Sequence, residues 1–587
     1  MKLSFVLLLF ISCFFSENAI AQHKPLLHSH NDYYHKIPFL TAYHHGFSSI
    51  EVDVILKNGE LYVAHSEDEI VENRTIESLY LQPLLAQAEQ GFTHSFTLLV
   101  DVKREAKGSL EQLKVLLEPH KGHFYPYTQK NAPKIVISGS RPLPKEMGDC
   151  PEYLFFDGRI EEKYDEKASA KVPLISLPFA RVSRWNGKGN IPAGDLKKLR
   201  IIIDKVHAQG KKIRFWGTPD TKTTWKAFAR LGIDYINTDK VEQVAGYFDK
   251  LERNEFQSAV THPIYTPRKR DFSNKKPQNI ILLIGDGMGI TQIYSGYTAN
   301  KGQLSLFQMP VTGLSITQSA DSYITDSAAG ATAMATGNKS NNRMVGTKPD
   351  STKAVSLTEI ARQKQMKTGV ISMGDITDAT PAAFYAHQPN RNMSKEIAQE
   401  LLSSSLDFAV GSGAHHFSST SVSDELPQNI KTGEKCIVVY PNEKMNRILD
   451  GREELFGKVF TSALEHLTNK KGFFLMAEGA QIDIGGHFND FPYVVSEVLD
   501  FDKVIGKALE YADKHQNTLV IVTADHETGG LSLLDGDVQK GYVEGSFSTN
   551  DHSAVMVPVF AYGPGAELFQ GVYQNTEIFH KILSLIK

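Results

Sequence analysis

Cysteine, net charge and long apolar runs are all scarce in this 587-residue sequence. Cysteines occur only at positions 13, 150 and 436, so a disulfide framework is excluded as the main source of stability, although Cys150 and Cys436 can still pair in an oxidising compartment. A formal net charge of −4 gives no electrostatic preference for nucleic acid. Beyond the first residues, no apolar stretch is long enough for a membrane span. A chain of this length exceeds one ordinary core, so we expect at least two domains.

Residues 1–21 have the pattern of a secretory signal peptide. A lysine precedes the apolar stretch "LSFVLLLFISCFF", and Ala19 and Ala21 form a small-residue cleavage site. Cys13 is an alternative lipid-attachment site, but Phe10 stands where such sites usually carry leucine. We therefore expect an exported protein, periplasmic or secreted, with lipid anchoring ranked second.

Residues 22–250 contain short apolar runs separated by amphipathic helical stretches. Strands that alternate with helices in this way predict a (β/α)8 barrel of the TIM type, whose active site lies at the carboxyl ends of the strands. The eight runs cover residues 26–30, 48–54, 96–102, 134–138, 153–157, 173–177, 212–216 and 234–238. The polar, proline-containing residues 251–275 then predict a linker.

Residues 276–587 have a different pattern of apolar runs. Apolar runs typical of buried strands, such as "IILLIGD" and "TLVIVTADH", end in acidic residues or histidine, and helical stretches separate them. This pattern predicts an α/β/α sandwich, in which helices cover both faces of a sheet and polar residues gather beyond the strand ends.

The polar residues at these strand ends are candidate metal ligands. Asp286 is followed by Gly-Met-Gly, which lets a ligand approach closely, and Asp483 and His487 share one face if their segment is helical. Asp and His without cysteine suit zinc in an open catalytic site, and additional oxygen ligands suit magnesium. The zinc-type candidates are Asp286, Asp483, His487, Asp525, His526 and His552, and the magnesium-type candidates are Asp378, Thr380 and Glu478.

In their order along residues 276–587, these motifs resemble the alkaline phosphatase family. They are "GDGMG", "TDSAAGATA", "DATPAAFYAHQPNR", "EGAQIDIGGH", "TADHETGG" and "DHSAVMVPVFAYGP". The resemblance implies two zinc ions and one magnesium ion. One zinc would take Asp483, His487 and His552, and the other Asp286, Asp525, His526 and Ser327. The magnesium would take Asp286, Thr380 and Glu478, with Asp378 holding its waters.

Ser327 is the nucleophile that this resemblance implies, acting through a phosphoserine on phosphate monoesters. We expect it at the start of a helix that runs to Gly337, with Thr325 or Asp326 near the cap, so that helix N–H groups face phosphate. Arg391 would clamp two phosphate oxygens.

Several departures and neighbouring residues qualify this assignment. Ile484 replaces a lysine or histidine of many members, which leaves affinity and pH optimum open, and the short region between Arg391 and Glu478 leaves a homodimer open. His387 is assigned to packing, and the pair His415–His416 to a surface loop.

Three alternative functions fit the sequence less well. A sulfatase needs a Cys/Ser-x-Pro-x-Arg setting, whereas Ser327 precedes Ala-Ala-Gly-Ala. Phosphodiesterases of the same superfamily usually carry threonine as nucleophile and lack an arginine like Arg391. A binding or adhesion protein would not need the metal set.

The first domain also carries acids and histidines. Glu51 and Asp53 lie two apart on a predicted strand and face the same side, and Asp101 ends the next run. Three carboxylates at a barrel mouth suit one Mg²⁺ or Ca²⁺, and His30 and His65 can serve as acid and base.

The motifs "HSHND", "IEVDV", "GELYVAH", "VDVK" and "KIRFWGTPD" in this domain resemble the glycerophosphodiester phosphodiesterase and phosphatidylinositol phospholipase C-like barrels. Lys103 and Trp216 would line the phosphate pocket. His28 is an alternative to His30 as the catalytic histidine, and an inert barrel used for binding is an alternative to a working enzyme. If active, the barrel would convert glycerophosphodiesters to monoesters for the second domain, in phosphate scavenging.

Overall fold

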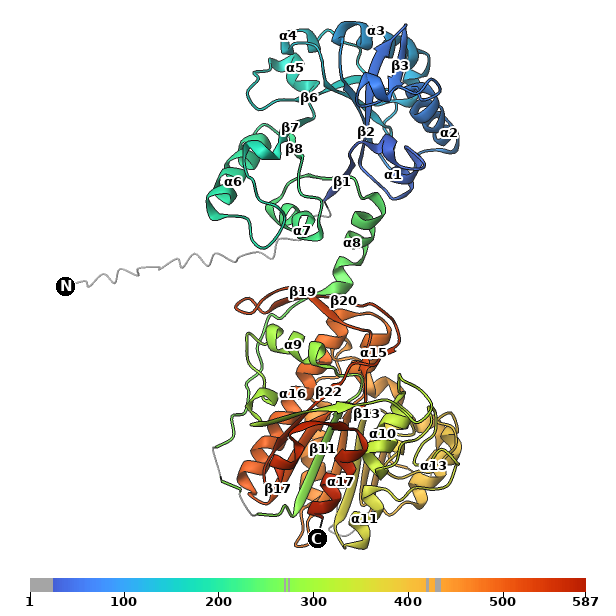
Figure 1. Cartoon of the computed structure of the whole chain (residues 1–587), viewed down its shortest axis with the longest axis vertical. Helices are drawn as coiled ribbons and strands as arrows, with labels where there is room; N and C mark the ends of the chain where they lie inside the picture. Colours follow the sequence, from blue (N-terminus) through green and yellow to red (C-terminus); the bar gives the residue numbers. More distant parts are fainter. Residues whose placement is uncertain (1–24, 269–270, 273–274, 419–421, 428–433, 587) are drawn as a thin grey trace, which may run out of the picture. The chain divides into compact units, whose positions relative to one another are not determined.

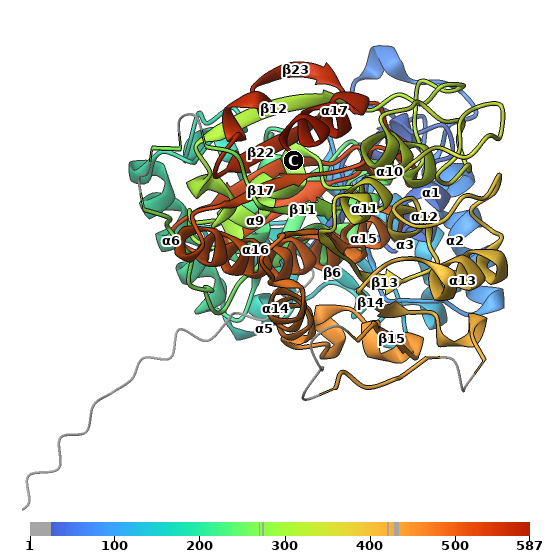
Figure 2. The same cartoon turned by 90° about the horizontal axis from the view of Figure 1, so that it is seen from below.

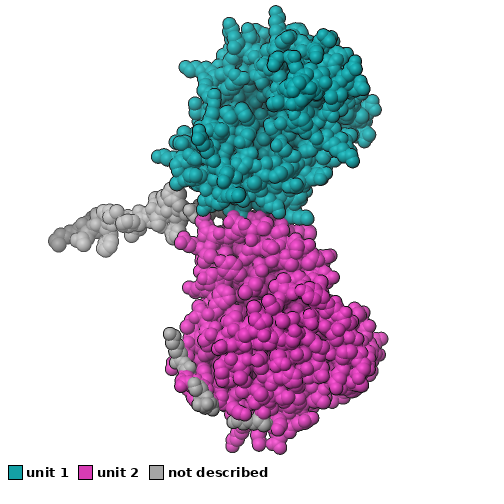
Figure 3. Space-filling model, viewed as in Figure 1, with its two compact units in different colours: residues 1–250 teal, residues 251–587 magenta. Residues whose placement is uncertain are grey.

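The computed structural model describes residues 25–268, 271–272, 275–418, 422–427 and 434–586, so the predicted signal peptide and Cys13 lie outside the described residues. The chain divides into two compact units, Met1–Lys250 and Leu251–Lys587 (Figure 3). Cys150 and Cys436 are free thiols. Among the described residues, no helix has the length and apolarity that a bilayer span requires.

Unit 1 is a closed barrel of eight parallel strands, which confirms the predicted fold (Figure 1). The order is β1-β9-β8-β7-β6-β5-β4-β2, and pairing of β1 with β2 closes it. All eight predicted runs form its strands: β1 (Leu26–Ser29), β2 (Ser49–Lys57), β4 (Thr97–Val102), β5 (Lys134–Gly139), β6 (Leu154–Gly158), β7 (Leu174–Pro178), β8 (Lys212–Trp216) and β9 (Tyr235–Thr238). A short strand, β3 (Glu60–Val63), pairs antiparallel with β2.

The helices of unit 1 alternate with these strands, as expected for a βα barrel. They are α1 (Leu40–His44), α2 (Gln82–Gln90), α3 (Ala106–Leu117), α4 (Pro144–Met147), α5 (Glu166–Ala170), α6 (Ala193–His207), α7 (Lys222–Leu231) and α8 (Val241–Asn254).

The barrel interior is layered along the strands. An apolar layer consists of Leu99, Val136, Phe155, Leu174 and Tyr235. Because strand side chains alternate with a period of two, the residues two positions further along point inward as well. On β4 to β7 these are Asp101, Ser138, Asp157 and Ser176, so the interior turns polar toward the carboxyl ends of the strands.

Unit 2 is built on a nine-stranded sheet with the order β15-β14-β13-β16-β11-β17-β22-β12-β23. Strand β22 runs antiparallel to both of its neighbours, whereas the other pairs are parallel. The strands are β11 (Asn279–Gly285), β12 (Val311–Ile316), β13 (Lys367–Asp375), β14 (Phe408–Ser412), β15 (Cys436–Tyr440), β16 (Phe473–Gly479), β17 (Thr518–Thr523), β22 (Val557–Tyr562) and β23 (Gly571–Gln574).

Helices cover both faces of this sheet, as the sequence predicts. On β11, Ile281 and Leu283 contribute to one hydrophobic core, and Ile280, Leu282 and Ile284 contribute to the other. Helices α14 and α16 supply much of the first core, and α10, α11 and α17 supply much of the second (Figure 2). The helices of unit 2 are α9 (Ile290–Ala299), α10 (Ser327–Thr336), α11 (Leu357–Gln363), α12 (Ala379–Ala382), α13 (Ser394–Ser403), α14 (Leu455–Leu467), α15 (Gln481–His487), α16 (Phe491–Lys514) and α17 (Thr576–Leu585).

Two small sheets complete unit 2. One has the order β10-β20-β19, formed by β10 (Glu255–Gln257), β20 (Tyr542–Ser546) and β19 (Ser532–Asp537), and the other pairs β18 (Glu527–Thr528) with β21 (His552–Ser553). Part of the segment predicted as a linker thus lies on unit 2 through β10. His262 Nε2 lies 2.8 Å from Asp502 Oδ2, and the Tyr265 hydroxyl donates to Asp513 Oδ2 over 2.8 Å.

Candidate active site

Three adjacent strands, β16, β11 and β17, bring the candidate ligands of unit 2 together. Glu478 lies near the end of β16, Asp286 follows β11, and Asp525 and His526 follow β17. Because the carboxyl ends of parallel strands share one edge of a sheet, these segments converge there. All four side chains are buried.

Helix α10 begins at Ser327, as the sequence predicts. Asp326 is the N-cap, and its side chain accepts a hydrogen bond from the Ala329 N–H at 3.0 Å. The helix ends at Gly337, whose φ of +70° is the left-handed conformation that favours glycine. All ten residues of the helix are buried. A Cβ added at Gly330 would lie 3.0 Å from the carbonyl oxygen of Asp525, so the small residues let the helix pack directly against the strand-end ligands.

Ser327 and three of the predicted ligands form one cluster. The Ser327 Oγ lies 3.1 Å from His526 Nε2. The same nitrogen lies 3.2 Å from Asp525 Oδ2 and 3.3 Å from Asp286 Oδ1. These two carboxylate oxygens are buried and accept no hydrogen bond among the described residues. A hydroxyl, an imidazole nitrogen and two free carboxylate oxygens therefore face one point.

A second cluster contains Asp483, His487 and His552. Asp483 and His487 share one face of α15, and His487 Nε2 lies 3.3 Å from Asp483 Oδ2. His552 Nε2 lies 3.2 Å from His487 Nε2 and 3.7 Å from Asp483 Oδ1. Both Nδ1 atoms donate to backbone carbonyls, that of His487 to Asn550 at 2.8 Å and that of His552 to Thr325 at 2.9 Å. The two Nε2 atoms are thereby turned toward each other and toward the carboxylate.

The magnesium-type candidates are less tightly grouped. The Thr380 hydroxyl donates to Asp286 Oδ2 at 3.3 Å, and Glu478 accepts a hydrogen bond from Ser372. Asp378 instead caps α12 and pairs with Arg391, whose Nη2 lies 2.7 Å from Asp378 Oδ1. Arg391 Nη1 also lies 3.5 Å from Oδ2 of Asp326, the N-cap of α10. This contact holds the guanidinium near the start of that helix.

Three buried carboxylates of this site, those of Asp286, Glu478 and Asp525, are harder to ionise than usual. Burial, then the neighbouring carboxylates Asp525 and Asp483, raise the pKa of Asp286 well above its usual range. Burial and the charge of Asp378 raise the pKa of Glu478 to about 8, and burial and Asp483 raise that of Asp525 to about 6. Positive charge brought to these groups would ionise them at neutral pH.

The histidines complement this negative charge. A hydrogen bond to Asp483 raises the pKa of His487 to about 9. Burial, then the charge of His552, lowers the pKa of His526 well below its usual range, which favours the neutral imidazole. Neutral imidazoles and carboxylates are the ligand set of catalytic zinc, and the orphaned oxygens of Asp286 and Asp525 supply free lone pairs. The residues therefore fit the metals that the sequence resemblance implies.

Sequence reasoning did not identify two residues that hold these ligands in place. The Thr528 hydroxyl donates to Asp483 and lies 3.1 Å from His526 Nδ1, so it links the two clusters. Ser372, on β13, supports Glu478. Thr528 stands inside the motif "TADHETGG", which is the signal that could have indicated it.

In unit 1, the predicted residues gather at the carboxyl end of the barrel. A pocket of 490 Å³ is lined by, among others, His30, Glu51, His65, Asp101, Lys103, Arg214 and Trp216. Lys103 Nζ lies 2.6 Å from both Asp53 Oδ2 and Asp101 Oδ2, and His65 Nδ1 lies 2.9 Å from Asp53 Oδ2. Glu51, Asp53 and Asp101 offer oxygens within 4.8 Å of one another. This oxygen cluster fits a divalent cation, with Lys103 supplying part of the positive charge.

His28 and His30 have different surroundings. His28 is fully buried, and its two ring nitrogens lie 2.7 Å from Ser49 Oγ and 2.8 Å from Glu51 Oε2. Burial, then the charge of Arg214, lowers the pKa of His28 to about 4. His30 lies at the pocket, with Nδ1 2.7 Å from Asp239 Oδ1.

Arg214 is the main residue of this pocket that sequence reasoning overlooked. Its Nη1 lies 2.8 Å from Glu51 Oε2 and contacts His28, and its Nε donates to Ser176 Oγ at 3.0 Å. Burial would lower its pKa, but Glu51 and Asp157 raise it, so the guanidinium stays charged inside the barrel.

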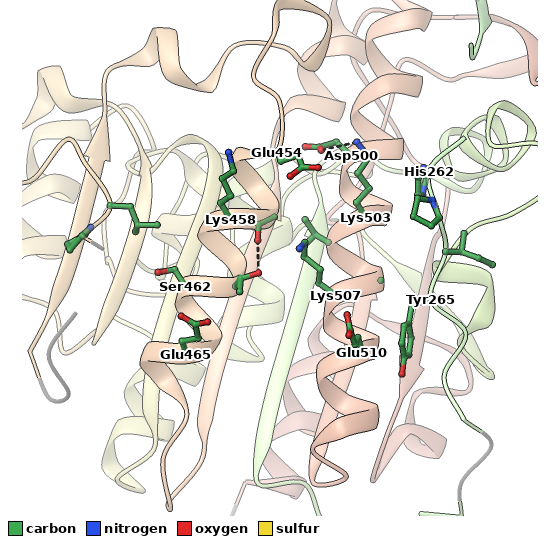
Figure 4. Close-up of a pocket in the computed structure, with 18 residues that line it drawn as sticks. His262, Tyr265, Glu454, Lys458, Ser462, Glu465, Asp500, Lys503, Lys507 and Glu510 are labelled. Atoms are coloured by element: carbon green, nitrogen blue, oxygen red, sulfur yellow. Dashed lines mark hydrogen bonds and ion pairs between the residues drawn. The ribbon is translucent and has the colours of Figure 1, made fainter. Parts of the chain in front are cut away.

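A larger cavity of 920 Å³ in unit 2 contains none of the predicted site residues. It lies between α14 and α16 (Figure 4). Its charged lining mixes signs: Glu454, Lys458, Glu465, Asp500, Lys503, Lys507 and Glu510. This mixture gives no concentration of one charge, and none of the groups of potential metal ligands found among the described residues lies in this cavity, so the strand-end clusters remain the better candidate site.

Comparison with known protein families gives a match that includes the strand-end clusters of unit 2. The alkaline phosphatase family model matches residues 277–456, 443–546 and 539–587. Shorter matches are to an AIM6-like phosphodiesterase domain over residues 18–93 and to the glycerophosphoryl diester phosphodiesterase family over residues 212–242.

Individual relatives match over most of their own length. Alkaline phosphatase 4 of Bacillus subtilis is 29% identical over 444 residues, covering 58% of this chain and 94% of that protein. The Escherichia coli alkaline phosphatase is 29% identical over 438 residues, covering 56% of this chain and 92% of that protein. Among solved structures, the alkaline phosphatase of the Antarctic bacterium TAB5 is 40% identical with a TM-score of 0.50, covering 53% of this chain and 98% of that one. Since the family model spans residues 277 to 587, more than half of the sequence, the chain belongs to the alkaline phosphatase family.

Proposed function

We propose that unit 2 hydrolyses phosphate monoesters through Ser327. The observation that carries this proposal is the position of Ser327 Oγ at the first turn of α10, 3.1 Å from His526 Nε2 and next to the free oxygens of Asp286 and Asp525. The chain's membership of the alkaline phosphatase family and the names of its relatives support the same reaction.

The metals proposed for this site are two Zn²⁺ and one Mg²⁺. Asp483, His487 and His552 would hold one zinc ion; Asp286, Asp525 and His526 would hold the other; and Asp286, Thr380 and Glu478, with Asp378 nearby, would hold magnesium. When bound, zinc lowers the pKa of a coordinated hydroxyl or water and offsets phosphate charge. A variant of the TAB5 enzyme has been solved with Mg bound in its M3 site, which supports a third metal site in this family.

The residues of the chain have separable roles in the proposed reaction. The Ser327 hydroxyl gives up its proton, and its Oγ forms a bond to phosphorus while the bond from phosphorus to the alcohol oxygen breaks and that oxygen takes up a proton. Water then cleaves the phosphoserine, which restores the serine hydroxyl and releases phosphate. Arg391 binds two phosphate oxygens, and the N–H groups at the start of α10 donate to phosphate. Asp326 and Asp378 hold the Arg391 guanidinium in position before substrate arrives.

Hydrolysis of p-nitrophenyl phosphate tests this proposal. Ser327→Ala should abolish turnover, whereas Ser403→Ala, which removes an exposed hydroxyl from α13, should match the wild type. Acid quench during turnover with ³²P-labelled substrate should trap label on the wild type and on Ser403→Ala, but not on Ser327→Ala. Unimpaired turnover in Ser327→Ala would refute the assignment.

We propose a second activity for unit 1: hydrolysis of glycerophosphodiesters to monoesters, with Mg²⁺ or Ca²⁺ held by Glu51, Asp53 and Asp101. The two short phosphodiesterase-type matches support it, as does the pocket that His30 and His65 line together. We favour His30 over His28 as the catalytic histidine because His28 is fully buried and engaged on both nitrogens. Lys103 and Trp216 would contact phosphate.

The Ser327→Ala variant makes this second activity measurable, because any monoester formed by the barrel then accumulates. Phosphorus NMR of a glycerophosphodiester incubated with this variant and Mg²⁺ or Ca²⁺ should show a monoester or a cyclic phosphate. Adding His65→Ala should stop its formation. An unchanged diester, with the wild type still hydrolysing monoesters, would favour the alternative of an inert binding barrel.

The two activities suit phosphate scavenging outside the cytoplasm. A diesterase releases monoesters, which the second unit converts to free phosphate. The N-terminal pattern of residues 1–21 supports export, and cell fractionation tests it.

A further inference from the structure

A third group of potential ligands in unit 2 lies apart from the residues assigned to the three metals. Asp375, His415 and His416 each offer one ligand atom, and these atoms lie within 4.8 Å of one another. His416 Nε2 is 3.3 Å from Asp375 Oδ2, and the rings of His415 and His416 have centroids 3.9 Å apart. The sequence analysis predicts a surface loop for both histidines, and the proposed reaction does not use them.

The backbone is shaped to bring these side chains together. Ile371 on β13 pairs with Val410 on β14, but Asp375 pairs with Ser412, so β13 carries two more residues than β14 over this stretch. Such a bulge redirects the side chains that follow it. The 3₁₀ turn Ala414–His416 begins just after β14 and presents both histidines from one short segment.

Gly413 makes room for the carboxylate of Asp375. Its φ is +96°, and a Cβ built there would lie 2.2 Å from Asp375 Oδ1 and 2.7 Å from Oδ2. A side chain at this position would therefore displace Asp375 from the histidines.

One oxygen of the Asp375 carboxylate is left for a ligand. Asp375 Oδ1 accepts from the N–H and the hydroxyl of Thr377, at 2.8 and 2.7 Å, whereas Oδ2 faces His416. No lysine or arginine pairs with Asp375 among the described residues. His415 is exposed, so a cation can reach the carboxylate and the two imidazoles from solvent.

We propose that Asp375, His415 and His416 bind a further divalent cation of the zinc class. Two imidazole nitrogens and one carboxylate oxygen are the ligands that Zn²⁺, Co²⁺ or Ni²⁺ take in sites with an open coordination position, whereas Mg²⁺ and Ca²⁺ prefer oxygen alone. Three protein ligands leave room for water.

The cation would also fix a turn that leads toward the proposed active site. The Asp378 N–H donates to the Asp375 carbonyl at 3.0 Å, and Asp378 caps α12, which carries Thr380. Binding at Asp375 therefore stiffens the segment that presents these two residues. The binding site itself does not depend on the proposed function, although this coupling to Asp378 does.

Metal counting on the full chain tests the site. Wild type and His415→Ala/His416→Ala are dialysed against the same low concentration of free Zn²⁺ with Mg²⁺ present, and zinc per chain is measured by mass spectrometry. The wild type should hold one zinc ion more than the double variant. His515→Ala/His580→Ala, which removes two imidazoles elsewhere in unit 2, should hold as much as the wild type.

A second measurement separates ligand loss from misfolding. Asp375→Asn keeps the shape of the side chain and should weaken binding of Co²⁺, followed by its visible absorption, while hydrolysis of p-nitrophenyl phosphate persists. Equal zinc content in the wild type and in the folded double variant would overturn the proposal. If the double variant does not fold, an unchanged Co²⁺ titration of Asp375→Asn overturns it instead. Loss of the extra zinc with intact hydrolysis supports the site independently of the proposed reaction.

Discussion

Removal of the metals should make the stability of unit 2 fall as the pH rises. Burial and the charge of Asp378 raise the pKa of Glu478 from 4.5 in the unfolded chain to about 8 in the fold. A group whose pKa is raised on folding stabilises the fold fully below its unfolded pKa and loses that contribution as the pH rises through its folded pKa. The metal-free fold should therefore weaken between pH 4.5 and pH 8, because Glu478 must lose a proton inside the cluster.

The magnitude follows from the size of this shift. One pKa unit corresponds to about 1.4 kcal/mol, so Glu478 alone should reduce the free energy of unfolding by roughly 2 kcal/mol between pH 6.5 and pH 8.5. His487, whose pKa is raised to about 9, changes stability in the same direction. The lowered pKa of His526 has the opposite effect, but only below the ordinary histidine pKa of 6.5, so measurements should begin there.

Guanidinium unfolding of the chelated protein at these two pH values measures the effect. Trp185, Trp216 and Trp225 all lie in unit 1, so tryptophan fluorescence follows the barrel, and a transition seen only by circular dichroism belongs to unit 2. Glu478→Gln, which cannot ionise, should lose about 2 kcal/mol less than the wild type over this pH range. The reasoning is wrong if both proteins show the same pH dependence without metal, or if adding Zn²⁺ and Mg²⁺ leaves the wild-type dependence unchanged.

Three further substitutions test other parts of unit 2. Arg391→Ala should reduce kcat/KM for p-nitrophenyl phosphate by roughly 100-fold, because the clamp on two phosphate oxygens is lost; steady-state kinetics with unchanged circular dichroism would check this. Gly330→Ala should destabilise unit 2 by about 1–3 kcal/mol in thermal unfolding, because the new methyl group contacts the Asp525 carbonyl. Gly246→Ala in α8, where the space around the glycine is open, should be neutral or stabilising in the same measurement. Arg452→Met should cost about 3–5 kcal/mol in guanidinium unfolding, because it removes the guanidinium that pairs with the buried carboxylates of Glu497 and Asp500. An equal loss at a pH low enough to protonate both carboxylates would contradict this cause.

Local patterns in the sequence were sufficient for much of this fold. The eight apolar runs of residues 22–250 all became barrel strands, because a buried strand needs only a short run of apolar residues bounded by turns. The helix from Ser327 to Gly337 was likewise predictable, since a capping aspartate and a left-handed glycine are local signals. Asp286, Glu478, Asp525 and His526 lie at strand ends, as the apolar runs before them predict.

Contacts between distant segments could not be predicted in this way. In "KIRFW", alternation places Lys212, Arg214 and Trp216 on one side of the strand, a pattern that indicates an exposed face. Only closure of the barrel reveals that this side faces a polar interior, where Arg214 meets Glu51. Similarly, Asp375 and His416 lie far apart in sequence, and only the pairing of β13 with β14 brings them together.

The attachment of residues 251–268 to unit 2 sets where the chain can be divided. Cutting just before Asn279, at the start of the first strand of the large sheet, would remove β10 and leave β20 as a bare edge that invites aggregation. It would also strip buried Asp502 of its contact with His262. A phosphatase unit produced without the barrel should therefore begin near Leu251, and a shorter version is expected to be poorly soluble even though every proposed catalytic residue is retained.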